Sequence, residues 1–278
     1  MHLPQITSLR WKLDRSLACG LSPDLRKSAV IIAPHPDDEV LGCGGTIARK
    51  IEERAVVHLV FMTDGATSHR RFIPSGELVR IRRGEAIEAA RILGVSEGHI
   101  TFLDYPDGRL HTAREAAVSR VTAFLATLHP EEVFVPYRFD GTSDHEETYA
   151  IVTEAIRGAN IPTRVFEYPV WFWNQWPWVS LPLRPNRQML NALRRSLRFG
   201  LGRTARQTFT HGVDVRRVVD KKRQALAAHR SQVTRLNGDP AWPILGDVSD
   251  GQFITCMTGD YEVFAANDGE FCSKPLNF

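Results

Sequence analysis

The sequence predicts an α/β protein in which a mostly parallel β-sheet is covered by helices on both faces. Short apolar runs alternate with longer segments whose apolar residues recur at helical spacing, from about residue 29 to residue 168. Polar and acidic residues follow four of the five apolar runs. In α/β proteins the carboxyl ends of parallel strands are where ligands bind, so we expect a functional site at that edge of the sheet.

The alternating region divides into five predicted strands and four predicted helices. The strands are expected near 29–34, 56–63, 100–104, 132–137 and 164–168, and the helices near 40–53, 77–94, 112–128 and 145–157. Beyond residue 168 the pattern is less regular. A helix is predicted from Val213 to about Arg230, and residues 253–257 and 261–266 are predicted to form a closing pair of strands. We expect one domain over 1–278, with an insertion at about 170–212.

Composition indicates a globular protein. The chain has 43% hydrophobic and 24% charged residues, and its formal charge of +3 is too small to indicate a nucleic-acid partner. Four scattered cysteines have neither disulfide nor thiolate-metal spacing, which favours a reducing compartment. The N-terminus does not resemble a signal peptide, and no run of eighteen apolar residues occurs. We therefore expect a cytoplasmic protein.

The turn at residues 34–39, Pro-His-Pro-Asp-Asp-Glu, has the chemistry of a metal site. Two prolines stiffen the backbone around His35, and the carboxylate of Asp38 lies close to it in sequence. An imidazole and a carboxylate suit a divalent ion such as zinc. Helix capping by Asp37 and Asp38 would leave His35 unexplained. A dinucleotide loop is disfavoured because acids at the helix N-terminus would repel a pyrophosphate.

The end of the fourth predicted strand supplies a further ligand. It is followed by Asp-Gly-Thr-Ser-Asp-His at residues 140–145, and we pair His145 with His35 and Asp38. Two histidines and one carboxylate leave an open coordination position, as in catalytic zinc sites. The neighbouring Asp37 is then free to accept a proton from the attacking water. The chain has no Gly-x-Ser-x-Gly motif, which weakens covalent alternatives.

These motifs resemble the LmbE-like, or PIG-L, family of metal-dependent N-deacetylases. Five segments match the family pattern in order. They are Ala33 to Glu39 with Gly42 to Gly45, Thr63-Asp64-Gly65, Arg82 to Glu85 with Leu93-Gly94-Val95, Asp107-Gly108 with Asp144-His145 after it, and Lys222 to Gln232.

The resemblance implies a Rossmann-like fold without a nucleotide and hydrolysis of the N-acetyl group of an N-acetylglucosamine-type amino sugar or its conjugate. It implies zinc, or another divalent ion such as Fe²⁺, at His35, Asp38 and His145, and a general base at Asp37.

The resemblance also implies residues around the substrate. Arg82, with Arg83 as the weaker match, would contact the substrate, the alternative being a solvated helix charge. Asp107 would accept a hydrogen bond from a sugar hydroxyl, unless it is only a turn residue. Asp144 would support the metal ligands from behind.

One position departs from the family pattern. Many members have a histidine where this chain has Thr142, and a threonine can donate a hydrogen bond to the substrate but carries no positive charge. We expect another histidine to stand in for it. His229, in the family-like carboxy-terminal segment, is the first candidate, and His211 is the second; an ordinary structural histidine is the alternative for both.

Residues 168–213 differ from the rest of the chain. Four tryptophans cluster at 171, 173, 176 and 178, several arginines follow, and no acid lies between Glu167 and Asp214. Leucines at 190, 193, 197 and 201 fall on helical spacing. This composition fits a helical insertion packed on the domain, a lid over a lipid- or phosphate-linked sugar, or a peripheral membrane contact through 184–206.

The favoured function is therefore a zinc-dependent N-deacetylase acting on a small-molecule amino-sugar substrate. Two alternatives remain open. One is a sugar- or carrier-binding protein of low activity, because Thr142 replaces the family histidine. The other is an amidase or esterase on a non-sugar substrate, because the carbonyl chemistry is shared. The sequence leaves the oligomeric state open.

Overall fold

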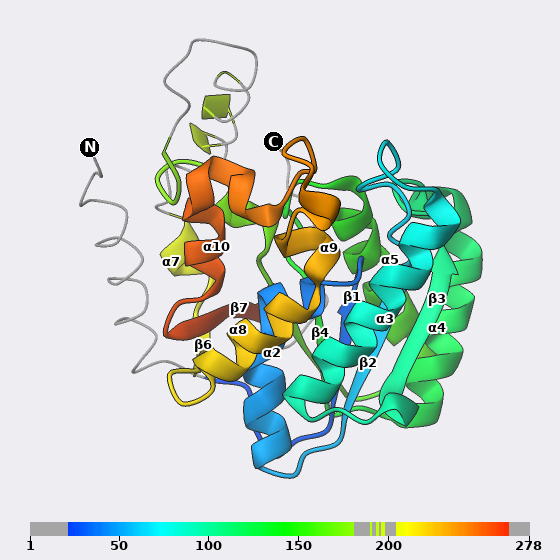
Figure 1. Cartoon of the computed structure of the whole chain (residues 1–278). Helices are drawn as coiled ribbons and strands as arrows, with labels where there is room; N and C mark the ends of the chain where they lie inside the picture. The colour runs from blue at the N-terminus through cyan, green and yellow to red at the C-terminus, as the bar shows by residue number, and fades with distance from the viewer. Residues whose placement is uncertain (1–21, 181–189, 191–192, 195, 198–203, 267–278) are drawn as a thin grey trace.

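A computed structural model describes residues 22–180, 190, 193–194, 196–197 and 204–266 of the protein (Figure 1). Its strands are β1 (Ala29–Ala33), β2 (Val57–Thr63), β3 (Ile100–Tyr105), β4 (Glu132–Pro136), β5 (Arg164–Tyr168), β6 (His211–Asp214) and β7 (Tyr261–Ala266). They form one sheet in the order β3-β2-β1-β4-β5-β7-β6. Strands β1 to β5 are parallel, and β7 is antiparallel to both β5 and β6. The prediction of a mostly parallel sheet is confirmed.

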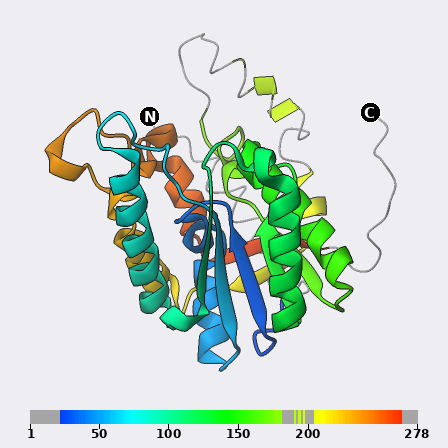
Figure 2. The same ribbon diagram turned by 90° about the vertical axis from the view of Figure 1, so that its right-hand side faces the viewer.

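Helices cover both faces of this sheet (Figure 2). One face carries α2 (Asp38–Glu52), α3 (Ser75–Leu93), α8 (Val219–Ala228) and α10 (Gln252–Met257), and the other carries α4 (Arg114–Leu128) and α5 (Ser143–Ala159). Strand β1 lies between the two layers and is buried along its whole length. Because side chains alternate along a strand, Ile31 contributes to the core under α2 and Ile32 to the core under α5.

The carboxy-terminal region differs from the prediction in two places. The segment predicted as a helix from Val213 forms the end of β6 and a turn before α8 begins. Residues 253–257, predicted as a strand, belong to α10. The buried residues of α10 are Phe253, Cys256 and Met257, which fall on one face of a helix. A short apolar run of this length does not distinguish the two structures by itself.

The tryptophan-rich segment is largely buried where it is described. Residues Trp171–Trp173 form a short 3-10 turn, and the side chains of Trp173 and Trp178 are buried against the core. Trp176 is 39% exposed. Most of the predicted leucine- and arginine-rich helix lies outside the described residues. A single domain with an insertion at about 170–212 stays a prediction.

None of the helices in the described part of the chain has the length and apolarity needed to cross a bilayer.

Candidate metal centre and active site

The three predicted metal ligands come together at the carboxyl edge of the parallel strands. His35 follows β1, Asp38 begins α2, and His145 lies in the first turn of α5. The Oδ2 atom of Asp38 lies 3.1 Å from Nδ1 of His35 and 3.2 Å from Nε2 of His145. One ligand atom from each residue lies within 4.8 Å of the others. The donor set and its spacing fit one divalent ion.

Carboxylates lie behind both histidines of this group. Nδ1 of His145 is 2.8 Å from Oδ2 of Asp140, and Nε2 of His35 is 3.2 Å from Oδ1 of Asp107 and 3.4 Å from Oδ2 of Asp144. A metal-binding histidine commonly donates its second ring N–H to a carboxylate, which fixes the ring orientation and makes it a better ligand. The surroundings of both histidines therefore also fit a metal site.

The structure places Asp107 differently from the sequence prediction. A contact to a sugar hydroxyl was expected, but the Asp107 carboxylate lies beside His35 and accepts hydrogen bonds from the backbone and hydroxyl of Thr67 at 2.9 and 2.8 Å. Asp144 lies where it was expected, behind the predicted ligands, and also accepts the Gly108 N–H. Sequence reasoning missed Asp140. The sign that could have found it was its position five residues before His145, in the turn that joins β4 to α5.

The charges of this cluster shift the pKa values of its three candidate ligands. Burial alone would raise the pKa of Asp38, but the two histidines outweigh it and hold that pKa well below its usual range. Burial opposes the charged form of His145, yet Asp38 and Asp140 raise its pKa to about 9. Burial likewise opposes the charged form of His35, whose pKa is nevertheless well above its usual value because of Asp107, Asp144 and Asp38.

Asp37, the predicted general base, sits at the sharp bend between β1 and α2. Its φ of 134° is rare for a residue with a side chain, and such strained positions cluster at functional sites. Its carboxylate Oδ1 lies 3.2 Å from the Nη2 atom of Arg82. Burial raises the pKa of Asp37 to about 6, with Arg82 opposing that shift and Asp38 adding to it.

Arg82 occupies a supporting position. Only 3% of it is exposed, and besides Asp37 its guanidinium donates to the backbone carbonyls of Pro36 and Gly65. A contact with substrate was predicted, but these bonds commit the side chain to the turn that carries Asp37. Arg83, the weaker match, instead pairs with Asp104 near the surface.

His229, the first candidate to stand in for the family histidine, lies at the end of α8 and contacts the first turn of α2. Its Nε2 atom lies 2.9 Å from Oε1 of Glu39, and the other oxygen of Glu39 accepts the Asp37 N–H at 2.9 Å. Both His229 and Glu39 are fully buried. Burial opposes the charged form of His229, but Glu39 and Asp37 raise its pKa above the usual value. His229 is therefore linked through Glu39 to Asp37, the predicted general base.

The second histidine candidate, His211, is not among the residues that the structure groups at the metal site. His211 lies on the edge strand β6, where its Nε2 atom is 2.9 Å from Nη2 of Arg164 and its Nδ1 atom is 3.0 Å from the Thr210 hydroxyl. Thr142 occupies the position just before α5 without a capping hydrogen bond, and its buried hydroxyl has no hydrogen-bond partner among the described residues. A contact between Thr142 and substrate stays a prediction.

Fold and site together define an α/β protein with a candidate catalytic metal centre at the carboxyl edge of its sheet. Residues 30–156 match the sequence model of the PIG-L family, described as GlcNAc-PI de-N-acetylase. Over these residues, slightly less than half of the chain, the sequence is similar to the PIG-L, or LmbE-like, family, whose members are metal-dependent N-deacetylases. The predicted resemblance to this family is confirmed over residues 30–156.

Individual relatives agree with this assignment. The chain is 32% identical over 140 residues to diacetylchitobiose deacetylase of Thermococcus kodakarensis. This match covers 49% of this chain and 51% of that protein. It is 28% identical over 268 residues to 1D-myo-inositol 2-acetamido-2-deoxy-alpha-D-glucopyranoside deacetylase of Rhodococcus jostii, covering 78% and 88% of the two chains. The chain thus spans about half the length of the first relative and most of the second.

Among solved structures, N,N'-diacetylchitobiose deacetylase from Pyrococcus horikoshii superposes with a TM-score of 0.60. The sequence identity is 22%, and the match covers 96% of this chain and 94% of that one. At this identity the likeness shows the fold.

Proposed function

We propose that this protein is a zinc-dependent hydrolase that removes the acetyl group from an N-acetylglucosamine-type conjugate. The observation that carries the proposal is the meeting of His35, Asp38 and His145 beside the buried carboxylate of Asp37. The curated relatives support the substrate class, because the two described above are named as deacetylases of N-acetylated amino sugars.

The three ligands would hold the ion, and a bound divalent ion lowers the pKa of water and polarises a carbonyl. Asp37 accepts a proton as the water oxygen bonds to the acetyl carbon. Its pKa of about 6 suits this role, since a general base works best when its pKa is near the working pH. As the C–N bond breaks, Asp37 returns the proton to the departing amine.

We assign His229 the part that Thr142 cannot play. Its raised pKa favours the imidazolium form, and it is joined to Asp37 through Glu39. A buried positive charge there stabilises the negative charge that develops on the amide oxygen as water attacks. Arg82 holds Asp37 in place through its contacts with Asp37 and Pro36.

Acetate release tests the proposal. Purified protein is incubated with N-acetylglucosamine in free, phosphorylated and carrier-linked forms, and acetate and the new amine are both quantified. We expect equal amounts of the two products from at least one sugar, loss of activity with a chelator, and recovery on adding Zn²⁺. Binding of a sugar without hydrolysis would favour a binding protein. Faster cleavage of simple acetamides or acetyl esters would favour the non-sugar alternative.

The same protein is proposed to work in the cytoplasm and to touch anionic membranes. The described free cysteines, Cys43 and Cys256, are buried thiols, in keeping with a reducing compartment. Leu190, Leu193 and Leu197 are 47%, 36% and 59% exposed in a part of the chain rich in arginine. Vesicles containing phosphatidylserine should retain the unaltered protein and release a variant with serine at these three leucines. Equal retention of both proteins would exclude a membrane contact through these leucines.

A further inference from the structure

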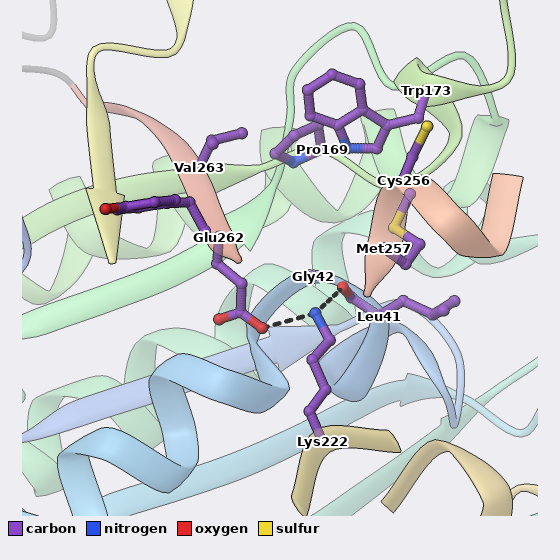
Figure 3. A pocket seen from close by; sticks show the side chains of 10 residues that line it. Leu41, Gly42, Pro169, Trp173, Lys222, Cys256, Met257, Glu262 and Val263 are labelled. Carbon is purple, nitrogen blue, oxygen red and sulfur yellow. Dashed lines mark hydrogen bonds and ion pairs between the residues drawn. The ribbon is translucent and has the colours of Figure 1, made fainter. Parts of the chain in front are cut away.

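Helix α2 is bound one turn after Asp38 by a buried ion pair. Nζ of Lys222, on α8, lies 2.7 Å from Oε1 of Glu262, on β7, and only 1% and 4% of the two side chains is exposed. Lys222 also donates to the Leu41 carbonyl at 2.9 Å. The two oxygens of Glu262 accept the N–H groups of Gly45 and Thr46, each at 2.7 Å. Figure 3 shows Lys222 between Glu262 and Leu41.

These contacts are made to the helix backbone. In a regular α-helix the amides of residues 45 and 46 point toward the carbonyls of residues 41 and 42. Here a cation binds the carbonyl of residue 41 and an anion binds both amides. These bonds tie residues 41–46 of α2 to α8 and β7. The pair therefore sets the path of α2 just behind Asp37 and Asp38.

The glycines of the motif at 42–45 permit this approach. A Cβ at Gly45 would lie 2.4 Å from Cγ1 of Val215 and 3.1 Å from Oε1 of Glu262. A Cβ at Gly44 would lie 3.1 Å from Cγ of Lys222. These glycines therefore serve close packing of α8 and β7 on α2, and not a nucleotide.

The cavity beside the pair does not offer a substrate site. It has a volume of about 10 Å³, the space of roughly one water-sized sphere, and is lined by Lys222, Glu262, Trp173 and Met257 among others (Figure 3). A sugar ring cannot enter it. The charged groups of Lys222 and Glu262 therefore bond to each other and to the backbone of α2, and not to a substrate.

Helix α8 meets α2 at a second point, seven residues along. His229, at the carboxyl end of α8, lies 2.9 Å from Glu39 in the first turn of α2, and Glu39 accepts the Asp37 N–H. Residues 222 and 229 are about two helical turns apart and lie on the same side of α8. A shift of α8 along α2 would therefore disturb both contacts together.

We propose that the Lys222–Glu262 pair is a positioning device that holds α8 in register on α2, so that His229 and Asp37 keep their relative places. Its effect on catalysis rests on the proposed function. A buried ion pair is weak support for stability, because desolvation of both charges offsets their attraction. A role in fixing geometry explains why the pair bonds to the backbone of the helix that carries Asp38. Small displacements of catalytic groups can cost about 100-fold in rate.

The chain contains a matched control on the same helix. Lys50, near the carboxyl end of α2, pairs with Glu132 at 2.6 Å, and the two side chains are 0% and 2% exposed. Glu262→Gln and Glu132→Gln each neutralise one buried carboxylate while keeping its shape. Both variants should melt at a lower temperature than the unaltered protein. We expect Glu262→Gln alone to lower kcat, by about 10- to 100-fold, with KM changed less than about threefold.

Hydrogen exchange supplies a readout that does not depend on a substrate. In Glu262→Gln, amides in 38–46 and 229–233 should exchange faster, whereas in Glu132→Gln those segments should match the unaltered protein. Equal exchange in those segments for both variants, or equal loss of kcat, would overturn the proposal. If Glu262→Gln does not fold, the double variant Lys222→Met/Glu262→Gln removes both charges and should give the same kcat and exchange changes. If the unaltered protein hydrolyses no substrate, the proposed function fails, and hydrogen exchange alone decides the positioning role.

Discussion

Residues 29–168 and residues 204–266 meet at α2 but contribute different things to the site. The first region is a regular alternation of strands and helices, and all three candidate metal ligands and Asp37 come from it. The second region is irregular and supplies Lys222, His229 and Glu262, which bind the helix carrying Asp38. In the proposed mechanism the first region provides the metal ligands and the base, whereas the second provides His229 and the contacts that hold α2 in place. Variants in the first should abolish function, and variants in the second should weaken it.

The largest effect is expected from His145→Ala. This change removes a candidate ligand that is fully buried between Asp38 and Asp140. Zinc content should fall below about a tenth of an equivalent, and kcat/KM should fall by at least about 1,000-fold. Metal analysis and acetate release measure the two effects. His111→Ala, on an exposed histidine, is the control and should change neither. Full zinc content in His145→Ala would show that the ligand assignment is wrong.

Asp37→Asn should separate chemistry from metal binding. The amide has nearly the shape of the carboxylate but cannot accept the proton, so kcat should fall by about 100- to 10,000-fold. Zinc content should stay at one equivalent, because Asp37 is not among the three grouped ligand residues. A kcat within about threefold of the unaltered enzyme would exclude Asp37 as the base.

Asp140→Asn should have a smaller effect on the same region. The change weakens the partner of Nδ1 of His145, whereas the amide oxygen can still accept some of the backbone N–H bonds from Val170, Trp171 and Phe172. Zinc affinity should fall by about 10- to 100-fold, as is typical when a carboxylate behind a metal-binding histidine is lost. Competition with a chelator of known affinity measures it. Unchanged affinity would remove Asp140 from the metal site.

The smallest change is expected in the zinc affinity of the unaltered protein when the pH is varied by one unit. His145 must lose its proton to bind an ion, and its pKa is raised to about 9 by Asp38 and Asp140 against the opposing effect of burial. Zinc affinity should therefore rise with pH, by up to about tenfold per unit between pH 7 and 9, and at least about one proton should be released on binding at pH 7. Calorimetry in buffers of different ionisation enthalpy measures this release. Binding without proton release would show that His145 is already neutral in the metal-free protein.

The sequence was sufficient for the first region because its signals are local. The strand and helix patterns span a few residues each, and the polar residues that follow the strands meet because parallel strands end at one edge. The direction of a side chain was harder to predict. Asp107 and Arg82 were expected at the substrate, but each is bound to a neighbouring part of the site.

The contacts made by the second region could not be predicted from the sequence in the same way. Glu262 accepts a hydrogen bond from the amide of Gly45, which lies 217 residues away in the sequence. Lys222 donates to the carbonyl of Leu41, which lies 181 residues away. A single sequence carries no sign of such pairs, and the region also contains the antiparallel strands β6 and β7, which do not follow the earlier alternation. Family resemblance brought His229 into consideration, but its partner Glu39 became visible only in the fold.

The location of a bound metal ion tests the central claim most directly, because His35 belongs to two candidate groups. It can share an ion with Asp38 and His145 through Nδ1, or with Asp107 and Asp144 through Nε2. A crystal of the zinc-loaded protein, measured on both sides of the zinc absorption edge, locates the ion by its anomalous scattering. We predict one peak bonded to His35, Asp38 and His145. A peak bonded to Asp107 and Asp144, with none beside Asp38, would contradict the account.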